Sequence, residues 1–238
     1  LTRLAGQDRR VCAITAAMTG GTGLEKFAQR FPDLFFDVGI AEGCAAAMAA
    51  GMAKQGAIPV FAVYSTFLQR AYDMLLHDAA IDNLHVVLGV DRAGLVGDDG
   101  ETHHGVFDAA YLDSVPNMTV LAPASFAELE VMLEHALFRL KGPVAVRYPR
   151  GGEGRYVGTA GEEPAAVLRS GDDITLASYG TEINEVLEAA DLLAQQGIRA
   201  EIVKLNQLTP LVPEVIERSI RKTGALLFAE EQTARGSV

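Results

Sequence analysis

The chain has 238 residues, 49% of them hydrophobic and 21% charged, which is enough apolar content for one large core or two smaller ones. Its 20 basic and 31 acidic residues give a net charge of −11, which disfavours nonspecific binding to nucleic acid or to an anionic membrane. No apolar run approaches the roughly 20 residues of a membrane span, and no signal-like stretch follows the start. We therefore expect a globular protein that binds neither nucleic acid nor membrane. Its two cysteines are too few to staple a domain of this size, which favours a cytoplasmic location. The absence of an initiating Met suggests a processed, cloned or partial chain.

Apolar, β-rich runs alternate with segments of helical period from the start of the chain onward. The first part predicts strands at 11–15, 35–38, 58–64, 85–90, 119–121 and 144–148, with helices at 24–30, 42–54, 68–82 and 126–140. Parallel neighbours require crossover connections, so this alternation predicts a doubly wound α/β domain with helices on both faces of a parallel sheet.

A stretch rich in Gly and charge, from 151 to 161, has the composition of a linker. The alternation then restarts, with strands predicted at 174–178, 200–205 and 225–229 and helices at 183–195 and 212–220. Three strands and two helices make a poor independent domain, so we expect a truncated α/β domain or one completed by another chain. The predicted domains are therefore 1–152 and 165–238, joined by a linker at 153–164.

Glu42 begins a predicted helix that is composed almost entirely of small apolar residues. A carboxylate in such surroundings is poorly solvated, and burial favours its protonated form, so it could share or donate a proton. A Glu in the first turn is also a common arrangement that the helix dipole favours. The residues alone leave both interpretations open.

Tyr64, Phe67 and Arg70 lie at the end of a predicted strand and in the following turn and helix, with Phe67 and Arg70 on one helix face. Ser65 and Thr66 predict an N-cap that exposes the start of this helix. Aromatic rings at this spacing can also serve as core filler.

Arg92 and Arg150 each follow a predicted strand, so their side chains can converge above the carboxyl edge of one sheet. Two guanidinium groups there would suit a phosphate monoester, because each presents a planar fork of donors. Surface salt bridges with the abundant acids are the plainer alternative.

A polar, Gly-rich loop at 97–105 contains Asp99 and His103 and holds too many titratable groups for a simple connector. The adjacent His103 and His104 could suggest a metal site, but zinc-ligand spacing is absent and no metal ligand is predicted in this chain. The Gly-rich run at 20–23 lacks the pattern of a phosphate-binding loop, so it gives only weak support to a phosphate site.

Four runs together resemble the 1-deoxy-D-xylulose-5-phosphate synthases, thiamine-diphosphate enzymes of the transketolase superfamily. They are Phe-Asp-Val-Gly-Ile-Ala-Glu at 36–42, Tyr-Ser-Thr-Phe-Leu-Gln-Arg-Ala-Tyr-Asp at 64–73, Asp-Arg-Ala-Gly-Leu-Val-Gly-Asp-Asp-Gly-Glu-Thr-His at 91–103 and Val-Arg-Tyr-Pro-Arg-Gly at 146–151. The resemblance covers nearly the whole chain but only the later part of such an enzyme. It implies a pyrimidine-binding domain followed by an incomplete transketolase C-terminal domain.

On the cofactor side, the resemblance implies that Glu42 contacts the aminopyrimidine nitrogen of thiamine diphosphate and activates the cofactor, while Phe67 stacks on the pyrimidine. Gly43 and Cys44 depart from the Gln-His that usually follows this Glu. Imidazole donates, accepts and carries charge near neutral pH, whereas an ordinary thiol does little of this. Cys44 is then either an inert thiol that packs in this Ala-rich helix or the mark of a degenerate paralogue, which could act as a noncatalytic interaction subunit.

On the acceptor side, the resemblance implies that His103 transfers protons and that a further group of residues binds the substrate. The arginines at 92 and 150 would hold the phosphate of glyceraldehyde 3-phosphate. The implied substrate-binding residues are Tyr64, Arg70, Arg92, Asp99 and Arg150.

The resemblance implies that magnesium and the cofactor diphosphate are bound by a domain that no segment here matches, and so by a missing domain or a partner chain. We expect the later portion or a subunit of a synthase that condenses pyruvate with glyceraldehyde 3-phosphate for isoprenoid and thiamine synthesis, inactive without a diphosphate-binding half. A split transketolase subunit is the second possibility. Because family enzymes bury their active sites at chain or domain interfaces, a homodimer is also expected.

Overall fold

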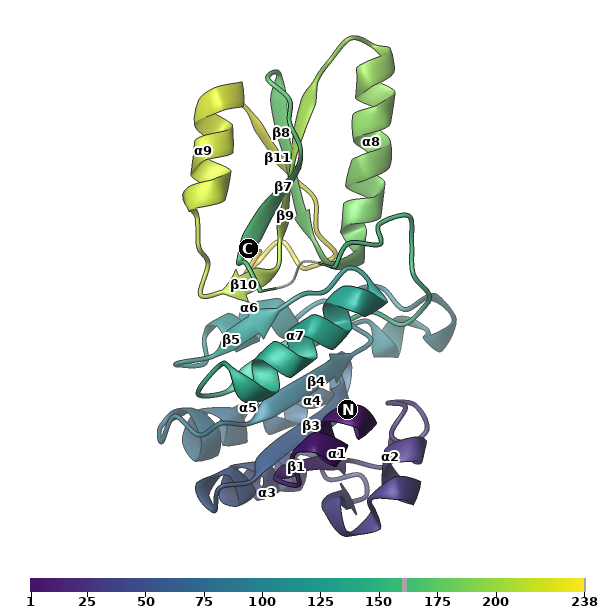
Figure 1. Cartoon of the computed structure of the whole chain (residues 1–238), viewed down its shortest axis with the longest axis vertical. Helices are drawn as coiled ribbons and strands as arrows, with labels where there is room; N and C mark the ends of the chain where they lie inside the picture. The colour runs from purple at the N-terminus through teal and green to yellow at the C-terminus, as the bar shows by residue number, and fades with distance from the viewer. Residues whose placement is uncertain (160–161, 238) are drawn as a thin grey trace.

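The computed structural model describes residues 1–159 and 162–237 and builds two α/β units, each on its own sheet (Figure 1). The larger sheet has the order β10-β5-β6-β4-β3-β1-β2 and is parallel except for β10. Its strands are β1 (Val11–Thr15), β2 (Phe35–Asp37), β3 (Ile58–Tyr64), β4 (Val87–Asp91), β5 (Thr119–Leu121), β6 (Val144–Tyr148) and β10 (Gln207–Thr209). The six strands predicted for this part of the chain are confirmed, with ends within two residues.

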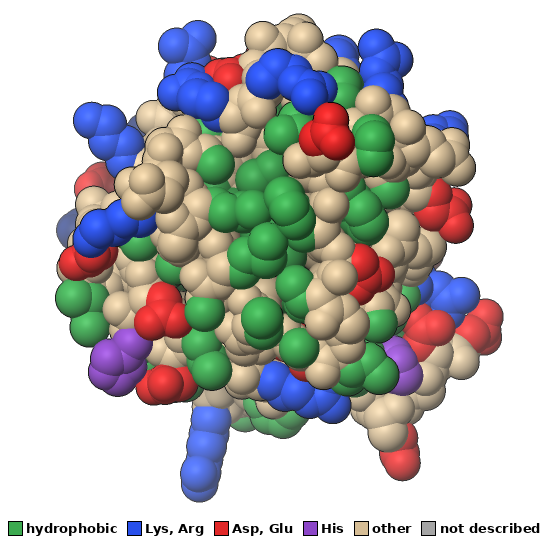
Figure 2. All heavy atoms as spheres, turned by 90° about the horizontal axis from the view of Figure 1, so that it is seen from below, with side chains coloured by type: hydrophobic (Ala, Val, Ile, Leu, Met, Phe, Trp, Pro, Cys, Tyr) green, Lys and Arg blue, Asp and Glu red, His purple; other side chains and the backbone are tan. Residues whose placement is uncertain are grey.

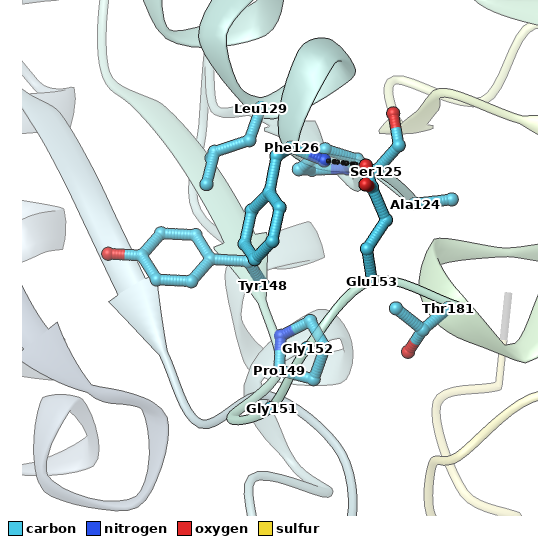
Figure 3. A pocket seen from close by; sticks show the side chains of 11 residues that line it. Ala124, Ser125, Phe126, Leu129, Tyr148, Pro149, Gly151, Gly152, Glu153 and Thr181 are labelled. Atoms are coloured by element: carbon cyan, nitrogen blue, oxygen red, sulfur yellow. Dashed lines mark hydrogen bonds between the residues drawn. The ribbon is translucent and has the colours of Figure 1, made fainter. Parts of the chain in front are cut away.

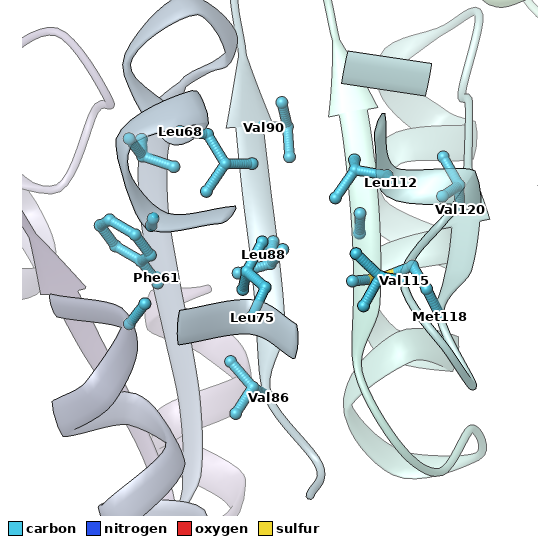
Figure 4. Packing of buried hydrophobic residues seen from close by; sticks show 14 of the residues in the cluster. Phe61, Leu68, Leu75, Val86, Leu88, Val90, Leu112, Val115, Met118 and Val120 are labelled. Carbon is cyan, nitrogen blue, oxygen red and sulfur yellow. The ribbon is translucent and has the colours of Figure 1, made fainter. Parts of the chain in front are cut away.

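Helices cover both faces of this sheet, as the doubly wound prediction requires. They are α1 (Thr2–Gln7), α2 (Glu25–Arg30), α3 (Glu42–Lys54), α6 (Asp108–Asp113) and α7 (Phe126–Phe138), with the 3₁₀ turn η1 (Pro32–Leu34) before β2. One core contains Phe61, Leu88 and Leu112 and lies between the sheet and α3 and α6 (Figure 4). A second core on the opposite face includes Phe27 of α2 and Met132 of α7. Helices α1 and α6 were not predicted from the sequence.

The segment after β3 is not the single helix predicted at 68–82. It consists of four short pieces, α4 (Ser65–Leu68), the 3₁₀ turn η2 (Gln69–Ala71), α5 (Tyr72–Met74) and the π-helical η3 (Leu75–Ala80). Helical period alone cannot distinguish these forms, since all of them return side chains to one face about every turn. Leu68, Leu75 and Ala79 are buried on that face, so packing holds the irregular backbone in place.

The second unit has a sheet of order β11-β8-β9-β7 rather than the three strands predicted. Its elements are β7 (Ala165–Arg169), β8 (Ile174–Tyr179), η6 (Gly180–Glu182), α8 (Ile183–Gln195), β9 (Ala200–Leu205), α9 (Glu214–Thr223) and β11 (Leu226–Phe228). The added strand, β7, pairs antiparallel with β9. Residues 160, 161 and 238 of the predicted linker and second domain lie outside the described residues.

Buried contacts join the units. The Lys204 ammonium of β9 lies 2.9 Å from the Glu128 carboxylate of α7, and both side chains are fully buried. In addition, β10 leaves the second unit and pairs antiparallel with β5 at the edge of the larger sheet. Within the described ranges, every helix is too short or too polar to traverse a lipid bilayer.

Candidate active site

The central strands of the larger sheet end level with one another. In the parallel register Tyr64 lies beside Asp91, and Asp91 lies beside Tyr148. The segments that follow these strands therefore start from one edge, which is where open α/β sheets bind ligands. Contacts join the eight residues predicted to act in catalysis or to bind cofactor or substrate into one cluster.

Glu42 is the first residue of α3, and only 4% of its surface is exposed. Its carboxylate Oε1 accepts a hydrogen bond from Arg70 Nη1 at 2.7 Å. The same guanidinium lies 4.9 Å from the centroid of the Phe67 ring. The predicted shared helix face of Phe67 and Arg70 is thus confirmed, and this face also reaches the buried acid.

Asp37, a residue that the sequence analysis did not select, shapes the turn that leads to Glu42. Its Oδ1 accepts from the backbone N–H groups of Ala17 at 2.8 Å and Gly39 at 3.0 Å, and its Oδ2 accepts from Thr19 Oγ1 at 2.9 Å. Burial alone would raise the pKa of Asp37, but these three donors lower it overall. An Asp at the end of a strand and two residues before a Gly is a turn signal that could have identified it.

An aromatic cluster lies between the buried acid and the arginines. The rings of Tyr64 and Phe67 stack with centroids 5.8 Å apart, and His103 meets Phe67 edge-on at 5.4 Å. Gly21 makes room for this cluster, because a Cβ there would lie 1.7 Å from the Tyr64 hydroxyl. The Gly-rich run at 20–23 thus has a packing role at Gly21.

Arg92 is held on several sides at the end of β4. Its guanidinium carbon lies 3.7 Å from the Tyr64 ring centroid, and its Nη1 contacts the carbonyl oxygen of Gly21 at 2.9 Å and Asp91 at 3.1 Å. Its backbone has a φ of 60°, a left-handed conformation that costs a residue with a side chain about 1 kcal/mol or more. The surrounding contacts maintain this conformation and fix where the side chain leaves the sheet.

Asp99 bridges the two arginines that the strand positions bring together. Its Oδ2 lies 3.2 Å from Arg92 Nε, and its Oδ1 lies 2.7 Å from Arg150 Nη1. The predicted convergence of Arg92 and Arg150 is therefore confirmed. The alternative of salt bridges with acids is also borne out in part, because the carboxylate of Asp99 lies between the two arginines and pairs with both.

Burial and a nearby charge shift the pKa of two further groups of the site. The pKa of Asp91 is raised, because burial outweighs the opposing effect of Arg92. The pKa of Tyr64 is also raised, chiefly by burial, with Arg92 again opposing. The neighbouring cation thus favours the ionised form of both groups, but burial has the larger effect on each.

The predicted N-cap at Ser65 and Thr66 is wrong. Tyr64 occupies the cap position without a side-chain hydrogen bond, and Ser65 is buried inside the first turn. Thr66 Oγ1 instead donates to the carbonyl oxygen of Thr102 at 3.1 Å. This bond fastens the segment after β3 to the loop that contains Asp99 and His103.

The two adjacent histidines have different partners. His103 Nδ1 lies 3.0 Å from Thr102 Oγ1, whereas His104 Nδ1 accepts from the Val96 N–H at 3.2 Å. Among residues 1–159 and 162–237, no three His, Cys, Asp or Glu side chains are grouped to hold a metal ion.

A small pocket of about 50 Å³ lies beside the β6 end, and none of its lining residues belongs to the cluster described above (Figure 3). Phe126, Leu129 and Tyr148 form an apolar wall, and the Glu153 carboxylate accepts from the Phe126 N–H at 2.9 Å. The cluster itself is open on one side, since the side chains of Arg70 and Arg150 are 56% and 41% exposed.

An apolar surface lies near the buried acid. Ile40, two residues before Glu42, is 83% exposed, and Cys44 and Ala47 are exposed on α3. Figure 2 shows hydrophobic side chains gathered in the middle of the face seen from below, at the end of the molecule where Figure 1 places α3.

Comparison with known protein families gives two adjacent matches. Residues 1–152 match the pyrimidine-binding domain of transketolase, and residues 163–238 match the transketolase C-terminal domain. The chain is 48% identical over 242 residues to the 1-deoxy-D-xylulose-5-phosphate synthase of Gloeobacter violaceus and 49% identical over 242 residues to that of Thermomicrobium roseum. Each alignment covers 99% of this chain but only 38% of the relative.

Solved structures give the same result. A split-gene transketolase, described as an inactive β4 tetramer, is 30% identical and superposes with a TM-score of 0.89, covering 99% of this chain and 78% of that one. A transketolase from Pichia stipitis shares the fold with a TM-score of 0.85 at 19% identity, over 99% of this chain and 38% of its own. The chain therefore belongs to the transketolase family, with a pyrimidine-binding domain followed by C-terminal domain sequence.

Proposed function

We propose that this chain supplies the pyrimidine-binding side of the active site of a thiamine-diphosphate-dependent 1-deoxy-D-xylulose-5-phosphate synthase. In this proposal pyruvate is the donor and glyceraldehyde 3-phosphate is the acceptor. The main support is the contact of the buried Glu42 with Arg70 beside the Phe67 ring, at the edge where Arg92 and Arg150 converge. Near 48% identity to synthases over almost the whole chain supports the same reaction.

The residues present fit the pyrimidine end of the cofactor. A buried carboxylate can accept a hydrogen bond from a ring nitrogen, and an adjacent aromatic ring can stack on a pyrimidine. Glu42 would hold the proton at that nitrogen, Arg70 would orient Glu42, and Phe67 would provide the stacking surface. Thiamine diphosphate, when bound, supplies the electron sink for carbon–carbon bond chemistry. Magnesium and the diphosphate would be held by groups outside the described residues.

The acceptor would bind along the rest of the cluster. Arg92 and Arg150 present guanidinium groups for a phosphate ester. The Tyr64 ring stacks on the Arg92 guanidinium, and His103 lies against the Phe67 ring. His103 would transfer the proton at the acceptor carbonyl oxygen. A partner half would close the open side and exclude water.

The apolar surface around Ile40, Cys44 and Ala47 supports docking of the diphosphate-binding half next to Glu42. Such a surface, placed beside a reactive carboxylate, is suited to a partner that completes the site. We expect Ile40→Glu to abolish co-purification with that half, while Leu192→Glu, at an exposed leucine of the second unit, leaves it intact. Equal binding by both variants would rule out this surface. A homodimer of the completed assembly is also proposed.

The direct test supplies the missing half in trans. The portion of the Gloeobacter violaceus synthase outside the matched region is mixed with this chain, and carbon dioxide release from pyruvate is followed with and without glyceraldehyde 3-phosphate. Glu42→Ala should abolish release. Glu214→Ala, which removes an exposed first-turn Glu of α9, should not. Equal turnover by wild type and Glu42→Ala would refute the proposal.

A split transketolase subunit is the second candidate, favoured by the 30% identical split-gene relative of which this chain covers 78%. Product analysis separates the two. Transfer of a two-carbon unit from ketose phosphates, without use of pyruvate, would identify the transketolase.

The third candidate is a noncatalytic interaction subunit, suggested by Gly43 and Cys44. A Cβ at Gly43 would lie 2.8 Å from the terminal methyl of Met74, so a longer side chain at this position requires that flexible methionine to move. The double change Gly43→Gln and Cys44→His is therefore tested in the assembled protein. If wild type and this variant both assemble and both remain inactive, the noncatalytic role is supported.

A further inference from the structure

The two arginines assigned to a phosphate ester are already paired with acids of the chain. Arg92 contacts Asp91 and Asp99, and Arg150 contacts Asp99. Two cations and two carboxylates give no net local charge. An incoming anion therefore meets a neutralised site rather than a free cationic one.

Asp99 holds the central position in this arrangement. Its two oxygens bind different guanidinium groups, the geometry that a bridging substrate oxyanion would adopt. Arg92 cannot easily turn away from it, because Tyr64 stacks on its guanidinium and its side chain is only 12% exposed. An incoming anion can therefore reach both guanidinium groups only if the Asp99 carboxylate moves away.

The backbone around Asp99 is suited to such movement. Gly97 and Gly100 flank it with φ values of 51° and 82°, a region that glycine adopts without strain. The base of the loop is fixed, since Gly94 and Gly105 exchange two backbone hydrogen bonds of 2.8 Å. Asp99 thus lies on a loop with a fixed base and permissive residues on both sides of the carboxylate.

We propose that Asp99 acts as a resident anion that makes the Arg92–Arg150 pair selective for phosphate dianions over carboxylates. Replacing the Asp99 carboxylate by the carboxylate of a ligand gains little binding free energy, because the two groups have the same charge and the same hydrogen-bond acceptors. A phosphate ester has nearly two negative charges and three acceptor oxygens, and so gains from the exchange. Asp99 would keep a small carboxylic acid such as the donor substrate from occupying the acceptor position. This inference rests on the proposed assignment of the two arginines to the acceptor phosphate.

Binding to the isolated full chain provides the test, with inorganic phosphate and acetate as probes at about pH 8, where phosphate is largely dianionic. Calorimetric titration gives the affinity for each probe. Asp99→Asn should raise acetate affinity about tenfold or more, since a competing charged hydrogen bond is removed, and should lower the phosphate-to-acetate ratio. Asp98→Asn makes the same charge change at an exposed neighbour and should alter neither affinity more than about twofold.

Asp99→Ala provides a second variant that removes the carboxylate, and thermal melting identifies variants that do not fold. An unchanged ratio in the folded Asp99 variants, or an equal change in Asp98→Asn, would overturn the inference. Failure of the proposed function has a different signature. In that case the assembled protein does not turn over pyruvate, while the phosphate-to-acetate ratio of the isolated chain still depends on Asp99.

Discussion

The guanidinium of Arg70 lies 2.7 Å from the buried carboxylate of Glu42, although the two are 28 positions apart in the sequence. Glu42 begins the helix after β2, and Arg70 lies in the 3₁₀ turn after β3. This pairing fixes the orientation of the proposed proton-holding group. We propose that it gives Arg70 a positioning role alongside the substrate contact inferred from the family resemblance.

We expect Arg70→Met to lower the free energy of unfolding by about 1 to 2 kcal/mol. Removing one partner leaves a buried charge unpaired, but the exposed Arg70 side chain reduces the effect. Urea unfolding measures the change. Glu42→Gln combined with Arg70→Met should recover part of the loss, and a double-mutant cycle with zero coupling would contradict this pairing.

The two cysteines should differ sharply in reactivity. Burial raises the pKa of Cys12 to about 11, so at about pH 8 only about one molecule in a thousand holds a thiolate there. Cys44 is exposed. A colorimetric thiol reagent should therefore label one site in the native chain and two in denaturant, and Cys44→Ser should remove the native reaction. Protection of Cys44 after the diphosphate-binding half is added would support docking at α3.

Asp37 should make part of the stability pH-dependent. Its pKa is lowered in the folded state, so its contribution is fully present above the unfolded value of about 3.9 and is lost as pH falls through the folded value. The unfolding free energy of wild type relative to Asp37→Asn should therefore decrease below about pH 4. Chemical unfolding between about pH 3 and 7 tests this. A difference that stays constant with pH would contradict it.

Replacing one residue of the buried Lys204–Glu128 ion pair should lower the stability of the protein more than replacing both. Among the residues that the structure describes, Lys204→Met leaves the buried Glu128 carboxylate with the Tyr156 hydroxyl and the Ala124 N–H as its hydrogen-bond donors, and should cost about 3 to 5 kcal/mol. Replacing both residues by Met should restore at least about half of that loss, because two similar apolar volumes need no charge compensation. Thermal denaturation and urea unfolding provide the measurement.

Strand positions could be predicted from the sequence, because buried parallel strands give continuous apolar runs that end at turn residues. The ends of these apolar runs also indicated where the site lies, because Arg92 and Arg150 each come just after a predicted strand. The short strands β7 and β10 were missed because each depends on antiparallel pairing with a distant segment rather than on its own sequence.

The interactions within the site were less predictable. The sequence placed Glu42 and Arg70 in separate roles, and it did not indicate that Asp99 bridges the arginines or that Asp37 anchors the turn before Glu42. These contacts depend on the π-helical and 3₁₀ backbone after β3 and on the left-handed Arg92, which local patterns do not specify.

Strand β10 belongs by sequence to the second unit and by hydrogen bonding to the first. Because of this shared strand, unfolding of either unit breaks the hydrogen bonds between β10 and β5. Cleavage of the connecting segment near residue 155 should therefore leave a nicked protein whose two pieces stay together and melt in one transition.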